Sequence, residues 1–88
     1  MGKHELIKDE TIQREVRYIS FMGRLHRYDL AIMDNSEDPT KKVVINLQNH
    51  HIAIIGSNDL SEKGNLAHSL LLSEMEADEV REVLQDIL

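Results

Sequence analysis

The chain of 88 residues contains no cysteine, no tryptophan and a single proline, and aromatic residues make up 3% of it. Without cysteine, the protein cannot form disulfides, thiol nucleophiles, iron–sulfur clusters or cysteine-ligated zinc sites. With so few aromatic residues, its core must be built from isoleucine, leucine, valine and methionine. A chain of this length forms one domain with a thin core, and association is one way to enlarge such a core.

Long apolar runs are also missing. No segment approaches the roughly twenty apolar residues of a membrane span, and the first ten residues lack the apolar stretch of a signal peptide. We therefore expect a cytoplasmic protein that does not bind membranes.

Basic residues are scarce in the last third of the chain. Residues 57–88 carry two Lys/Arg against eight Asp/Glu, and the net charge of the whole chain is −6. Proteins that bind duplex nucleic acid need a net basic face that releases counterions. We therefore expect no nucleic-acid partner.

The strongest strand signal runs from Lys41 to Gly56, KKVVINLQNHHIAIIG. Two β-branched runs with period-two alternation flank a polar break at Asn49-His50, which predicts a hairpin at the centre of a sheet. The same alternation predicts earlier strands at residues 12–22 and 27–33. A last strand at residues 66–72 is a weaker prediction, because that run is equally compatible with a helix.

The C-terminal segment has the pattern of an amphipathic helix. Ser73 and Glu76 form a capping box, and apolar residues follow at helical spacing. This apolar stripe must pack on one face of the sheet, and it consists of Ala77, Val80, Leu84 and Ile87. The predicted fold is α+β: an antiparallel meander of four to five strands with one C-terminal helix, in which residues 1–11 form a flexible arm and residues 12–88 a single domain.

The first predicted strand is apolar on both sides. Tyr18 and Met22 share one face, while Ile19 and Phe21 share the other. One helix covers only one face of a sheet, and an uncovered apolar patch on a small protein usually marks an interface. We therefore expect a homodimer with Tyr18 and Met22 in its interface.

In a meander, the turn after the first strand and the turn of the central hairpin lie at the same end of the sheet. That end gathers histidine and arginine side chains that suit a small anion or a metal, namely Arg24, His26, Arg27, His50 and His51. The structural alternative is solvated turns with surface ion pairs worth about 0–1 kcal/mol each. No histidine has a ligand spacing such as HExxH, so no metal site or cofactor is assigned.

No serine lies in a nucleophile elbow and no glycine-rich loop opens a helix, so we assign no catalytic residue and expect no enzyme. The primary prediction is a non-enzymatic protein-interaction module that acts as a homodimer with an unidentified protein partner. The alternative is a small-ligand (anion) or metal-binding protein that uses the histidine- and arginine-bearing end.

Several motifs carry a resemblance to a known family. They are RYISFMG (Arg17 to Gly23), RYDLAI (Arg27 to Ile32), IAIIG (Ile52 to Gly56) with the NDL that follows, and the LSE…EVREVL helix. Over residues 16–88 the chain resembles an uncharacterised family of short cytosolic proteins of Firmicutes, such as bacilli and staphylococci. The resemblance implies a shared fold and no particular activity.

Overall fold

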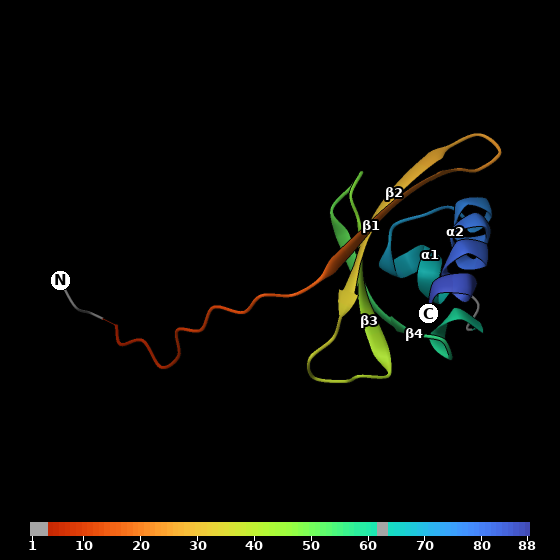
Figure 1. Cartoon of the computed structure of the whole chain (residues 1–88). Coiled ribbons are helices and arrows are strands. Elements are labelled where there is room, and N and C mark those ends of the chain that lie inside the picture. The colour runs from red at the N-terminus through yellow and green to blue at the C-terminus, as the bar shows by residue number, and fades with distance from the viewer. Residues whose placement is uncertain (1–3, 62–63) are drawn as a thin grey trace.

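The computed structural model describes residues 4–61 and 64–88, and within them four antiparallel strands form one sheet (Figure 1). The strands lie side by side in chain order: β1 (Val16–Met22), β2 (Arg27–Asp34), β3 (Lys41–Asn46) and β4 (His51–Gly56). A turn of 3-10 helix, η1 (Asp59–Ser61), and two helices, α1 (Asn65–Ser69) and α2 (Glu74–Ile87), follow the sheet. The predicted meander with a C-terminal helix is confirmed.

The central hairpin forms where the alternation predicts it. Val44 pairs with Ala53 and Ile45 pairs with Ile52 across β3 and β4. Within the turn, His50 has a left-handed φ of 64°. The Asn49 side chain has another role, because it accepts a hydrogen bond from the His51 amide (2.9 Å) and donates one to the Leu70 carbonyl (3.0 Å).

Helix α2 begins with the predicted capping box. The Ser73 hydroxyl accepts a hydrogen bond from the Glu76 amide (3.2 Å), and the Glu76 carboxylate accepts one from the Ser73 amide (2.9 Å). These bonds satisfy two donors at the helix start that would otherwise lack partners. Ala77, Val80 and Leu84 are then buried, as the apolar stripe predicts.

The core lies between one face of the sheet and the helices, which cover that face together (Figure 1). We call this side the covered face. Its buried side chains come from β2, β3 and β4, namely Tyr28, Leu30, Ile32, Val44, Ala53 and Ile55. Leu60, Leu66 and Leu70 join the three α2 residues on the helical side, so η1 and α1 share the covering with α2.

The fifth strand does not form, because the segment predicted at residues 66–72 contains helix α1 instead. Leu66 and Leu70 are both buried, whereas His68, which would share their face in a strand, is exposed; this burial pattern suits a helix rather than a strand. The helix ends in a Schellman motif: the Leu72 amide donates to the Ala67 carbonyl (2.8 Å), and Leu71 has a φ of 54°. The chain thus turns directly from α1 into the cap of α2.

Strand β1 begins at Val16, four residues later than predicted. Among the described residues β1 pairs with β2 alone. Because β2 ends at Asp34, opposite Glu15 in this register, residues 12–14 have no strand residue to pair with. The described residues before β1, residues 4–15, form an extended segment without helix or strand, which we call the arm. The arm projects from the side of the sheet that the helices leave uncovered (Figure 1).

Candidate functional site

The face of the sheet opposite the helices is apolar across all four strands. The register aligns Tyr18, Ala31, Ile45 and Ile52 in one row across the sheet. A second row consists of Val16, Met33, Val43 and Ile54. We call these eight residues the open face.

Several side chains of the open face are well exposed to solvent. Tyr18 is 71% exposed, and Ile52 and Ile54 are 59% and 56% exposed. The other larger side chains are partly buried, namely Val16, Met33, Val43 and Ile45. Ala31 is only 2% exposed, because its methyl group lies between the larger side chains of its neighbours in the row. A contiguous apolar surface is unusual on a small monomeric protein, which makes the open face a candidate interface.

Tyr18 and Met22, the two residues predicted to contribute to an interface, are both 71% exposed. Tyr18 lies within the open face, whereas Met22 is the last residue of β1 and pairs with Arg27 beyond the two apolar rows. The structure therefore places both on the surface, with Tyr18 nearer the centre of the patch. Their contact with a partner stays a prediction.

A polar cluster around Asp29 borders the open face toward the turns. The Asp29 carboxylate accepts hydrogen bonds from the Ser20 hydroxyl (2.5 Å), the Gln48 amide (3.4 Å) and the Arg27 guanidinium (3.3 Å). The Ser20 bond, aided by Gln48 and Arg27, lowers the pKa of Asp29 below its ordinary value. Asp29 thus joins β1, β2 and the hairpin turn, which is a structural role.

The predicted histidine- and arginine-bearing end is divided between two turns. His26 lies over α2, with its Nε2 atom 3.8 Å from a Glu76 carboxylate oxygen. Arg27 pairs with Asp29, and Gln48 donates to the Arg27 carbonyl, which joins the two turns. His50 and His51 are exposed at the other turn.

Across residues 4–61 and 64–88, no three His, Asp or Glu side chains gather closely enough to hold a metal ion. Ligand binding by the histidine- and arginine-bearing end therefore stays a prediction, and the described residues offer no preformed metal cluster in its support.

The tip of the β1–β2 hairpin is fastened to α2 by Glu79. Its carboxylate accepts hydrogen bonds from the Tyr28 hydroxyl and from the Arg24 amide, both at 2.6 Å. These bonds, the Tyr28 bond first, lower the pKa of Glu79, while burial and the same bond raise the pKa of Tyr28. Gly23 permits this approach, because a Cβ atom at that position would overlap the Glu79 carboxylate.

This role of Glu79 is not among the predictions made from the sequence. The Tyr28–Glu79 contact joins residues 51 positions apart, so no local sequence pattern predicts it. The signal that could have pointed to it is a tyrosine on the predicted apolar side of a strand, since a buried hydroxyl needs a partner.

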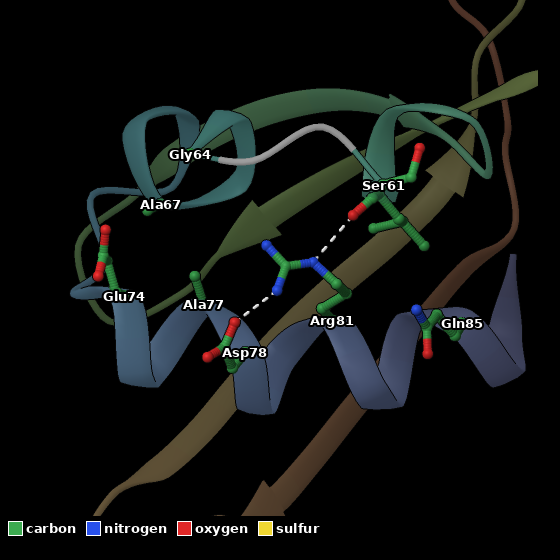
Figure 2. A pocket seen from close by; sticks show the side chains of 9 residues that line it. Ser61, Gly64, Ala67, Glu74, Ala77, Asp78, Arg81 and Gln85 are labelled. Carbon is green, nitrogen blue, oxygen red and sulfur yellow. Dashed lines mark hydrogen bonds and ion pairs between the residues drawn. The ribbon is translucent and has the colours of Figure 1, made fainter.

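A hollow lies between α2, η1 and α1, and Figure 2 shows Arg81 pointing into it. The Arg81 guanidinium donates to the Leu60 carbonyl (2.8 Å) and to the Asp78 carboxylate (2.5 Å). Glu74 also lines this hollow, so the described residues around it include two carboxylates, Glu74 and Asp78, and one cation. Arg81 fastens η1 to α2 here, and its charge is already paired, which disfavours an anion site.

Among the described residues, no helix is both long and apolar enough to cross a membrane. Within residues 4–61 and 64–88, the open face is the surface on which apolar side chains of all four strands meet, and the arm lies beside it.

Comparison with known proteins gives the chain a family. No curated protein matches it. The model of an uncharacterised family, described as SAV0927-like, matches residues 7–86, which is most of the chain and includes part of the arm. The chain therefore belongs to the SAV0927-like family.

Proposed function

We propose that the protein is a non-enzymatic protein-interaction module of the cytoplasm that acts as a homodimer, with the open face of each copy in the dimer interface. The single observation that carries the proposal is the apolar character of the open face on all four strands, with Tyr18, Ile52 and Ile54 more than half exposed. Covering these side chains would gain about 25 cal/mol for each Å² of apolar surface removed from water.

The non-enzymatic part of the proposal is supported by the structural hydrogen bonds that polar side chains make. Ser20 binds Asp29, and Ser73 caps α2. Glu76 and Glu79 fix the start of α2 and the hairpin tip. Each of these groups has a structural partner, so none is held ready as a nucleophile or a general base.

The experiment is a measurement of mass in solution by sedimentation, over a wide range of protein concentration. We expect the wild-type chain to reach twice the 10.1 kDa of one copy. Tyr18→Arg places an unpaired charge in the interface and is expected to shift the protein to one copy, because a buried charge without a partner is costly.

Met75→Arg is the matched control, because Met75 is also solvent-exposed (42%) but lies on α2, on the other side of the sheet. This variant should keep the wild-type mass. A wild-type chain that stays at 10.1 kDa at every concentration, or a Tyr18→Arg variant as dimeric as Met75→Arg, contradicts the proposal.

A further inference from the structure

The arm is a mostly polar and charged segment that carries three exposed apolar side chains and contributes none of them to the core of its own domain. Leu6 is 76% exposed, Ile7 is 100% exposed and Ile12 is 55% exposed. Its base is fixed, because the Arg14 guanidinium donates to the Asp34 carbonyl at the end of β2 (3.0 Å). Beyond Arg14 the arm leads away from the sheet on the uncovered side (Figure 1).

The arm is part of what the family shares. The family match begins at Ile7, nine residues before β1 starts at Val16. A segment that contributes nothing to its own core, yet belongs to the family's sequence, calls for a role outside its own domain.

The open face by itself is small for a specific interface, so an additional contact from the arm would enlarge it. Four strands about 4.8 Å apart, paired over about six residues at about 3.4 Å each, present roughly 400 Å² of projected area. A specific interface buries about 800 Å² of accessible surface on each partner. The apolar side chains of the arm are the nearest additional surface for closing this gap.

The reach of the arm is sufficient to cross a second copy. Twelve extended residues at about 3.3 Å each span about 40 Å. The molecule is 27 × 23 Å across its two shorter axes, so the arm can pass over the whole face of a partner. A tethered segment of this kind also acts at a high effective concentration once the two copies have met.

We infer that the arms are exchanged in the homodimer: residues 4–15 of each copy lie against the open face of the other and bury Leu6, Ile7 and Ile12 there. The inference rests on the proposed function, since it requires the second copy. It adds that the arm supplies part of the binding energy and that it acts on the partner's face rather than on its own.

The absence of cysteine makes disulfide trapping a clean test. Full-length chains with Ile7→Cys and full-length chains with Ile54→Cys, carrying different tags, are mixed, equilibrated and mildly oxidised. We expect a covalent dimer that contains one chain of each kind. Met75→Cys replaces Ile54→Cys in the control mixture, which should give several-fold less mixed product because Met75 lies on the helical side of the sheet.

Two outcomes overturn the inference. A mixed product no more abundant than in the Met75→Cys control means that the arm does not reach the partner's face. A chain carrying both Ile7→Cys and Ile54→Cys that closes within itself, while the mixture of single variants gives no mixed product, means that the arm covers its own face.

A second measurement keeps this failure distinct from failure of the proposed function. Ile7→Asp should raise the dissociation constant of the dimer about tenfold or more, because burying an isoleucine side chain is worth at least that factor. Thr11→Asp, which adds the same charge at a polar position of the arm, should have a much smaller effect. A dimer whose dissociation constant is unchanged by Ile7→Asp retains the proposed function and refutes the exchange, whereas a monomeric wild-type chain refutes both.

Discussion

The two faces of the sheet carry the same kind of side chain and meet different surroundings. Ile54 and Ile55 are neighbours in β4, yet Ile54 is 56% exposed on the open face and Ile55 is 4% exposed on the covered face. Alternation along a strand separates the two faces but does not say which one is covered. What distinguishes them is the apolar stripe of α2, which is wide enough for one face only.

The largest expected difference between the faces concerns packing. Leu84 on α2 is 0% exposed, so Leu84→Ala should lower the free energy of unfolding by about 2–5 kcal/mol through lost burial and an incompletely filled cavity. Ile54→Ala on the open face should cost less than about 1 kcal/mol, since much of that side chain is already in water. Urea unfolding in the Tyr18→Arg background, which removes association, provides the comparison. Equal costs at the two positions would contradict the assignment of the faces.

The next effect concerns the one buried polar side chain that the described residues place on the covered face. Asn46 is 5% exposed; its amide donates to the Leu70 carbonyl (3.3 Å), and its side-chain oxygen accepts from the Gln48 amide (3.1 Å). Asn46→Ala should cost about 1–3 kcal/mol, because the Leu70 carbonyl and the Gln48 backbone amide each lose a partner, the Leu70 bond being buried.

Asn49→Ala is the matched control, because Asn49 donates to the same Leu70 carbonyl from a half-buried position where water can replace it. Its cost should be the smaller of the two by thermal or urea unfolding. A larger cost for Asn49→Ala would mean that the hairpin turn, and not the covered face, holds α1 in place.

The smallest expected effect on stability concerns the tip of the β1–β2 hairpin, which Glu79 fastens to α2. Because folding lowers the pKa of Glu79 below its ordinary 4.5, the carboxylate adds stability above that value, and this stability is lost as pH falls through the folded pKa. Glu79→Gln should therefore lower stability at neutral pH and have less effect in acid, where the wild-type carboxyl is protonated too.

Thermal unfolding between pH 3 and pH 7 measures this difference. Glu82→Gln removes one exposed charge from the same helix and separates the loss of the hairpin contact from the loss of charge. A Glu79→Gln variant whose stability difference from wild type is the same at every pH would show that the contact does not depend on the charge.

The fold followed from the sequence wherever the signal was local. The hairpin of β3 and β4 was visible in its alternation, and the cap and stripe of α2 in the spacing of Ser73, Glu76 and the apolar residues after them. Residues 66–72 were ambiguous because leucines at positions 66, 70 and 72 satisfy both period two and a helical spacing of four. Only the partners of Leu66 and Leu70 in the core decide for α1.

The candidate site followed from the sequence in part. Alternation placed Tyr18 on a face separate from Ile19, and a single helical stripe implied that one face stays open. The contribution of Met33, Val43 and Ile54 depends on strand register, which the sequence alone does not give. Glu79 and Arg81 make non-local contacts that the sequence does not predict. Their charged groups therefore hold elements of the fold together instead of being available to a ligand.

The most direct test of the account follows the isoleucine methyl groups by NMR in the presence of a soluble paramagnetic agent, at increasing protein concentration. We expect Ile55 to be protected throughout, whereas Ile54 should be broadened in dilute solution and become protected at the concentrations where the dimer forms. An Ile54 methyl group broadened at every concentration as strongly as in Tyr18→Arg would contradict the claim that a second copy covers the open face.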